Sequence, residues 1–145
     1  MVVGPRILIV EDHHVFSDAL ELLLGERLRE ERVGRAEFRR AATVAGGLGL
    51  VQEDGPFDVA IVDLMLPDGD GTDVVRKIKA SNPETRVAVL SSALDLSGSL
   101  EAGADEVIGK ERPLVEIISH LACLAGVGPD VSAAKGARHK RHVSA

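Results

Sequence analysis

Asp58-Val-Ala-Ile-Val-Asp63 places four consecutive aliphatic residues between two aspartates. Runs of the same kind occur at Arg6-Ile-Leu-Ile-Val10 and Arg86-Val-Ala-Val-Leu-Ser91, and weaker ones at residues 36–42 and 106–110. A strand that faces solvent on one side alternates apolar and polar residues, whereas a strand covered on both faces is apolar throughout. These runs therefore predict the strands of a parallel sheet that is buried on both faces.

Amphipathic stretches separate these runs. Apolar residues recur three or four positions apart, as on one face of an α-helix, within residues 16–24, 74–78 and 114–125. Thr43 is a suitable N-cap for a further helix over residues 44–51, although three glycines disfavour that helix. Asp70 or Thr72 is expected to cap the helix over residues 74–78, and Asn82-Pro83 is expected to end it.

Strand and helix patterns alternate five times along the chain. Because β-α-β connections are right-handed, this order predicts an α/β fold with a doubly wound five-stranded parallel sheet and helices on both faces. The 145 residues fit one domain, which we assign to residues 1–125. The charge-rich residues 27–40 are expected to form a solvated helix end and a loop, and residues 126–145 a flexible basic tail.

Charge is unevenly distributed along the sequence. Four of the 17 basic side chains, but only one of the 23 acidic ones, follow Gly128, so the first 128 residues carry a net charge of −9. Such an acidic domain is not expected to bind nucleic acid, and only the basic tail leaves that possibility open.

Apolar stretches and the single cysteine indicate the cellular compartment of the protein. No stretch approaches the roughly 18 apolar residues that span a membrane, and no signal peptide is visible. The single cysteine, Cys123, excludes an internal disulfide framework, and its apolar neighbours predict a buried thiol. A cytoplasmic protein without membrane contacts is expected.

Residues capable of chemistry lie where the predicted strands end. In open parallel sheets, ligands bind beyond the carboxyl ends of the strands, and five such residues lie there: Glu11, Asp12, Asp63, Ser91 and Lys110. Three converging carboxylates repel one another by about 4 kcal/mol per pair at ~4 Å and an effective dielectric of ~20. A divalent cation such as Mg²⁺ removes this repulsion, and a lysine with a hydroxyl completes a set suited to phosphoryl transfer.

Three blocks of the sequence resemble those of response-regulator receiver domains, in order and spacing. They are Ile7-Leu-Ile-Val-Glu-Asp-His13, Asp58-Val-Ala-Ile-Val-Asp-Leu-Met-Leu-Pro-Asp-Gly-Asp-Gly71 and Gly103-Ala-Asp-Glu-Val-Ile-Gly-Lys110. Each block is modest evidence alone, but together they make a specific match that extends over residues 6–125. The resemblance, which is to chemotaxis-type receivers, implies a flavodoxin-like fold with strand order 2-1-3-4-5.

The resemblance also implies roles for individual residues. Asp63 would be the phosphoacceptor, with Ser91 and Lys110 in contact with the phosphoryl group. Mg²⁺ would be held by the side chains of Glu11, Asp12 and Asp63 and by the backbone carbonyl of Met65. The donor would be a phosphohistidine of a sensor histidine kinase or of a histidine phosphotransfer protein. Phosphorylation would switch protein–protein contacts in two-component signalling, with a homodimer possible and the output domain or downstream protein unknown.

The chain departs from the family pattern at several points. Val107 occupies a position that is usually aromatic, whose ring moves together with the hydroxyl residue upon phosphorylation. Residues 95–103 contain Gly98 between two serines, which predicts a short or irregular fourth helix. These departures support an alternative in which the receiver serves as a phosphorylation-independent protein-interaction module.

Two further alternatives arise from the same residues. A haloacid-type phosphatase also uses a nucleophilic aspartate and Mg²⁺, but it carries a second acid where this chain has Met65, so we expect no such enzyme. The domain would catalyse only its own phosphorylation and dephosphorylation. His13 and His14 leave open a ligand role, although we expect them to open the first helix.

Overall fold

The computed structural model describes residues 3–92, 100 and 102–128. Its central sheet contains five parallel strands in the order β2-β1-β3-β6-β7. These strands are β1 (Val3–Val10), β2 (Arg35–Ala41), β3 (Val59–Asp63), β6 (Arg86–Ser91) and β7 (Glu106–Gly109). When only the parallel strands are counted, this is the order 2-1-3-4-5, so the predicted flavodoxin-like fold is confirmed.

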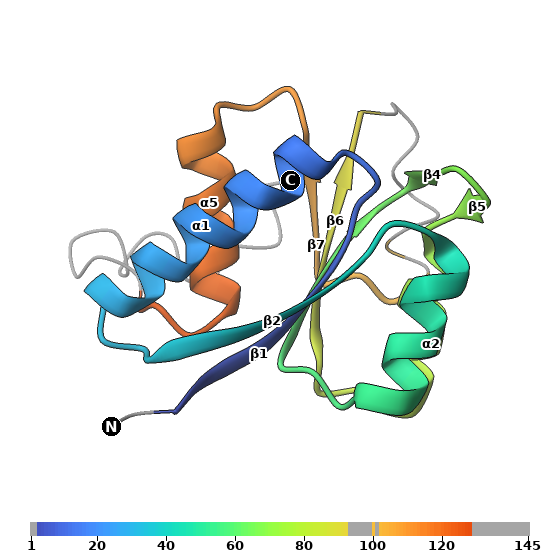
Figure 1. The fold of residues 1–145 in the computed structure, drawn as a ribbon, viewed down its shortest axis with the longest axis horizontal. Coiled ribbons are helices and arrows are strands. Elements are labelled where there is room, and N and C mark those ends of the chain that lie inside the picture. Colours follow the sequence, from blue (N-terminus) through green and yellow to red (C-terminus); the bar gives the residue numbers. More distant parts are fainter. Residues whose placement is uncertain (1–2, 93–99, 101, 129–145) are drawn as a thin grey trace.

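Helices cover both faces of the sheet, as Figure 1 shows. α1 (His14–Glu30) and α5 (Leu114–Leu124) pack on one face, and α2 (Val44–Asp54) and α3 (Thr72–Ser81) pack on the other. None of the described helices is long and apolar enough to cross a membrane.

All five residues of β3, the central strand, are buried, which accounts for its uninterrupted apolar sequence. Val59 and Ile61 belong to the core layer beneath α1 and α5, whereas Ala60 and Val62 belong to the layer beneath α2 and α3. Because successive side chains point to opposite faces, a strand with a core on each side is apolar at every position. The strand ends in Asp63, which reaches the edge of the sheet.

A two-stranded antiparallel hairpin follows β3. It consists of β4 (Met65–Leu66) and β5 (Gly69–Asp70), and no pattern in the sequence predicts it, because strands of two residues have no periodicity. At its base the N–H of Gly71 donates a hydrogen bond to the Leu64 carbonyl at 2.9 Å. A Cβ atom on Gly71 would overlap the carbonyl oxygen of Asp63, so only glycine fits at this position.

The weak strand predicted at residues 36–42 is confirmed as β2, whereas the loop expected within residues 27–40 is confined to residues 31–34. α1 continues to Glu30 with Leu28 fully buried, and only residues 31–34 connect it to β2. β2 lies at the edge of the sheet and pairs with β1 alone. Charged residues on an edge strand prevent pairing with other chains, which explains why this strand has the composition of a loop.

The cap expected for α2 is found, whereas the N-cap residue of α3 is Gly71, which makes no side-chain hydrogen bond, and Asp70 directly precedes it. The Thr43 hydroxyl accepts a hydrogen bond from the N–H of Gly46 at 2.9 Å, and α2 extends beyond residue 51 to Asp54. The Asp70 carboxylate accepts one from the N–H of Thr72 at 2.9 Å, and α3 ends just before Asn82.

The C-terminal part of the described chain differs from expectation at two residues. Cys123 is exposed, so the prediction of a buried thiol is wrong; α5 turns Leu121 and Ala122 into the core and leaves Cys123 on its outer side. Val127 is buried against the α1 and α5 layer, so the packed part continues beyond residue 125. Most of the predicted irregular helix at residues 95–103 and most of the predicted tail lie outside the described residues, so the helix prediction stays open.

Asp68, at the tip of the hairpin, caps α2. Its carboxylate oxygens accept hydrogen bonds from the N–H groups of Ala45 at 3.0 Å and Val44 at 2.7 Å. These bonds, that of Ala45 first, hold the pKa of Asp68 below that of a free aspartate. The first turn of a helix has unpaired N–H donors, and a carboxylate there satisfies them and interacts favourably with the helix dipole.

An Asp68→Ala variant is therefore expected to be less stable than the wild type at neutral pH and equally stable in acid. Because the folded pKa lies below the unfolded value of about 3.9, the carboxylate stabilises the fold above that pH, and the contribution is lost as the pH falls through the folded pKa. Thermal unfolding followed by circular dichroism, without divalent cations, measures the difference. A difference that stays constant from neutral to strongly acidic pH would contradict this role.

Candidate functional site

The predicted site residues gather at the carboxyl edge of the sheet. Asp63 is the last residue of β3 and Ser91 the last of β6, while Glu11 and Lys110 directly follow β1 and β7. β3 lies between β1 and β6, so Asp63 is flanked on both sides. The convergence expected from the sequence is therefore found at this edge.

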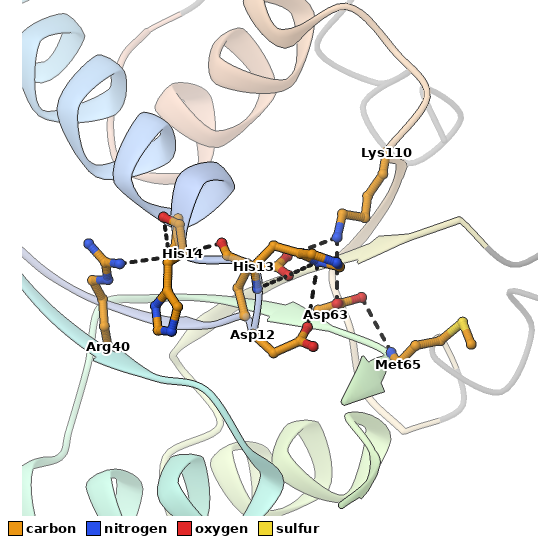
Figure 2. A network of polar contacts seen from close by, with 9 residues as sticks. Asp12, His13, His14, Arg40, Asp63, Met65 and Lys110 are labelled. Carbon is orange, nitrogen blue, oxygen red and sulfur yellow. Dashed lines mark hydrogen bonds and ion pairs between the residues drawn. The ribbon is translucent and has the colours of Figure 1, made fainter. Parts of the chain in front are cut away.

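Lys110 contacts both buried acids. Its Nζ lies 3.0 Å from Oε1 of Glu11 and 3.5 Å from Oδ2 of Asp63, and Figure 2 shows the lysine extending toward Asp63 from the far side of the site. The side chains of Glu11, Asp63 and Lys110 are only 1%, 5% and 17% exposed. The Phe16 ring centre is 4.8 Å from the same nitrogen. Burial makes these charges depend on one another, because water screens them little.

The two buried carboxylates differ in their proton affinity. Burial raises the pKa of Asp63, the negative charge of Glu11 raises it further, and the nearby ammonium of Lys110 offsets only part of this. Burial acts on Glu11 as well, but hydrogen bonds from Lys110 and from the His13 backbone outweigh it and hold its pKa below the usual value. The negative charge of Asp63 is therefore less well compensated than that of Glu11, and a further positive charge would stabilise it.

Asp12 lies beside this pair and fits a metal ligand. Its Oδ1 atom is buried and has no hydrogen-bond partner among the described residues; Nδ1 of His13, at 3.6 Å, is too distant. Potential ligand atoms of Glu11, Asp12, His13 and Asp63 all lie within 4.8 Å of one another. A buried oxygen without a partner is unfavourable, and grouped carboxylate oxygens are ligands that Mg²⁺ prefers.

Met65 and Ser91 are the remaining predicted site residues. The N–H of Met65 donates a hydrogen bond to Oδ1 of Asp63 at 3.3 Å, while its side chain points away and is largely exposed (Figure 2). Ser91 is buried, and its backbone carbonyl accepts a hydrogen bond from the N–H of Lys110 at 3.0 Å. Both residues are thus joined by backbone hydrogen bonds to the central charged residues.

Two residues at the site were not assigned to it from the sequence. The backbone N–H and the Nδ1 atom of His13 each lie 3.1 Å from Oε2 of Glu11, so this histidine fixes the carboxylate in place. His13 directly precedes α1, as expected of a residue that opens the helix, and its position after two acids was the available signal. Phe16 had no such signal, because only the tertiary fold brings its ring to Lys110.

The model of the response regulator receiver domain family matches residues 7–122 of this chain. The chain belongs to this family. The receiver domain is 32% identical over 128 residues to the sensory transduction protein RegX3 of Mycolicibacterium smegmatis, covering 86% of this chain and 52% of RegX3. It is 32% identical over 131 residues to the transcriptional regulatory protein TcrA of Mycobacterium tuberculosis, covering 87% of this chain and 48% of TcrA. The receiver domain thus spans about half the length of these curated relatives.

Solved receiver domains share its fold. The non-phosphorylated receiver domain of HemR from Leptospira biflexa is 29% identical, with a TM-score of 0.66, and the match covers 87% of this chain and 98% of that one. A CheY-like receiver domain protein from Methanospirillum hungatei is 28% identical, with a TM-score of 0.66, and covers 88% and 100%. The receiver family recognised in the sequence is confirmed.

Proposed function

We propose that this receiver domain accepts a phosphoryl group on Asp63 from a phosphohistidine of a sensor histidine kinase or a histidine phosphotransfer protein. The observation that carries the proposal is the environment of Asp63, a buried carboxylate at a strand end with Lys110 3.5 Å away and further acids beside it. A buried carboxylate with a raised pKa beside a specific cation is a candidate for a functional group. The names of the relatives, which are sensory transduction and transcriptional regulatory proteins, support a signalling role.

The proposed transfer moves one phosphoryl group between two nucleophiles. An oxygen of the Asp63 carboxylate forms a bond to phosphorus while the P–N bond to the donor imidazole breaks. The electron pair of that bond stays with the imidazole, which takes up a proton. Lys110 stabilises the negative charge of the phosphoryl oxygens, and the Ser91 hydroxyl donates a hydrogen bond to one of them.

Mg²⁺ fits this proposal as the cofactor. Glu11, Asp12 and Asp63 would hold it together with the backbone carbonyl of Met65. The buried Oδ1 atom of Asp12, which has no hydrogen-bond partner among the described residues, supports that assignment. When bound, the ion offsets the negative charges of the carboxylates and of the phosphoryl group.

Phosphorylation would act by changing protein contacts. The candidates are a second copy of the domain, an output domain or a separate downstream protein, and the acidic surface makes direct contact of the domain with nucleic acid unfavourable. The domain would accelerate its own phosphorylation and dephosphorylation, and would not be an enzyme for a separate substrate. A cytoplasmic location, where kinase phosphohistidines are formed, belongs to the same proposal.

Intact mass spectrometry of the chain after incubation with acetyl phosphate tests the proposal. With Mg²⁺ we expect a gain of one phosphoryl group, and with the metal removed by a chelator we expect almost none, because the charge between donor and carboxylates then stays uncompensated. A chelator control with Mg²⁺ added back in excess excludes damage to the protein. No gain in Mg²⁺, or an equal gain with chelator, would contradict the proposal.

One observation favours a second candidate, the phosphorylation-independent interaction module. Val107 stands at the position that is usually aromatic in receivers, and it is 1% exposed and packs within the layer of α2 and α3. This chain therefore has no ring there to move together with the hydroxyl of Ser91. The same mass measurement separates the two candidates, because the module predicts no gain under any condition.

A further inference from the structure

Asp68 joins the hairpin that follows Asp63 to the helix α2. Its two carboxylate oxygens accept hydrogen bonds from the first two N–H groups of that helix, Val44 at 2.7 Å and Ala45 at 3.0 Å. The Val44 distance is at the short end of the usual range, the Ala45 distance is ordinary, and a carboxylate acceptor makes both bonds stronger than neutral ones. These two bonds join Asp68 to residues that lie 24 and 23 positions before it in the sequence.

The hairpin has few other attachments. Only two residue pairs, Met65 with Asp70 and Leu66 with Gly69, connect its strands. A hairpin of this size is not stable alone, so its position depends on the contacts it makes with the rest of the fold. The side chain of Leu66 is buried and anchors the middle of the hairpin.

The tip of the hairpin lies against the beginning of α2. In Figure 1, β4 and β5 lie next to the N-terminal end of this helix. A Cβ atom on Gly69 would be 3.6 Å from the Val44 side chain, so this side chain lies close to the Gly69 backbone. Asp68 thus supplies the polar attachment at the same point where the packing contact occurs.

The hairpin begins with the residue that touches Asp63. The N–H of Met65 donates to Oδ1 of Asp63 at 3.3 Å, and Met65 lies three residues before Asp68. The Leu64–Gly71 hydrogen bond holds the base of the hairpin, and Asp68 holds its tip. The orientation of the Met65 peptide units next to Asp63 therefore depends on both attachments.

We infer that Asp68 is a positioning residue: by tying the hairpin to α2, it holds the Met65 backbone beside Asp63 and so increases the affinity of the site for a divalent cation. The inference rests on the proposed function, because it concerns the same metal site. Groups that orient metal ligands from outside the coordination sphere typically contribute 10- to 100-fold to metal affinity.

Thr43 provides a matched control. Its hydroxyl caps the same helix end through the N–H of Gly46 at 2.9 Å, and within the described part of the chain it has no hydrogen bond to the hairpin. Thr43→Ala therefore weakens the N-terminus of α2 without releasing the tip. Asp68→Asn gives a graded variant, because the amide oxygen can replace only one of the two acceptor oxygens.

Isothermal titration calorimetry of the metal-free chain with MgCl₂ tests the inference without any phosphoryl donor. We expect Asp68→Ala to bind Mg²⁺ at least about tenfold more weakly than the wild type, Asp68→Asn to fall between them, and Thr43→Ala to bind like the wild type. At saturating Mg²⁺, Asp68→Ala is expected to recover most of the wild-type phosphorylation rate, because the loss lies in metal affinity.

Three results would overturn the inference while leaving the proposed function intact. Wild-type affinity in Asp68→Ala would show that the hairpin holds its position without the tie, and an equal loss in Thr43→Ala would assign the effect to the stability of α2. A phosphorylation rate that stays low at saturating Mg²⁺ would place the defect outside metal binding. If the wild type itself neither bound Mg²⁺ nor became phosphorylated, the proposed function would fail first.

Discussion

Replacing Asp63 with asparagine is expected to abolish phosphoryl uptake from acetyl phosphate at any Mg²⁺ concentration. The amide retains the shape of the side chain but has no anionic oxygen to form the bond to phosphorus. Glu11, the other buried acid of the site, is held by Lys110 and His13 and is therefore not expected to substitute. Intact mass after incubation with acetyl phosphate measures the effect, and persistence of the phosphoryl gain in this variant would place the acceptor elsewhere.

The same Asp63→Asn substitution is expected to stabilise the metal-free protein by about 1 kcal/mol at neutral pH. Burial and the charge of Glu11 raise the folded pKa of Asp63 above its unfolded value of about 3.9. Protonated Asp63 therefore favours folding in acid, and that advantage is lost as the pH rises through the folded pKa. The asparagine variant does not ionise and avoids this loss. The difference in free energy of unfolding between the variant and the wild type should therefore grow from acid to neutral pH, and it should vanish when Mg²⁺ stabilises the wild type.

Chemical denaturation at several pH values, with and without Mg²⁺, measures this advantage. The two readouts of the variant have opposite signs, loss of phosphorylation and gain of stability. A general disturbance of the fold would lower both, so it cannot imitate the expected pair of results. A destabilised variant at neutral pH would contradict the electrostatic account of the site.

Replacing Lys110 with methionine is expected to slow phosphorylation about 100-fold, the typical cost of removing one group that stabilises developing charge. Without metal it is also expected to lower the free energy of unfolding by about 3–5 kcal/mol, because Glu11 and Asp63 would remain buried without their shared cation. Mg²⁺ should recover part of the stability by supplying positive charge, but not the rate. Single-turnover mass measurements and denaturation curves give the two quantities.

Lys79 is the matched control for this prediction. Its side chain is 19% exposed, close to the 17% of Lys110, and its Nζ pairs with Asp105 at 2.9 Å, away from the site. Lys79→Met is expected to lower stability whether or not Mg²⁺ is present and to leave the phosphorylation rate unchanged. Equal rate losses in both variants would mean that Lys110 acts only through the fold.

The buried strands and their terminal acids could be predicted because their environment is uniform. β3 has a core layer on each face, so each of its residues before Asp63 is aliphatic and its end is marked by the first charge. The carboxyl ends of parallel strands meet at one edge, so placing the strands also brought Glu11, Asp63 and Lys110 together.

Prediction from local sequence failed where two different structural environments favour the same amino-acid composition. The edge strand β2 is half exposed and rich in arginine, which made residues 27–40 resemble a loop. The hairpin of β4 and β5 is too short for any period, and Cys123 has apolar neighbours along the chain although it lies on the outer side of α5. In each case, the fold decides which side of an element faces water.

Sequence determined the type and order of the main elements, the family and the residues that could form the site, because periodicity and strand ends are local properties. Tertiary structure alone decided which charged groups pair. Lys110 donates a hydrogen bond to Glu11 across 99 residues, and Asp68 accepts hydrogen bonds from the first turn of α2 across 24 and 23 residues. Such pairings depend on how loops cross the edge of the sheet, and the low dielectric of the buried site then makes each partner necessary to the other.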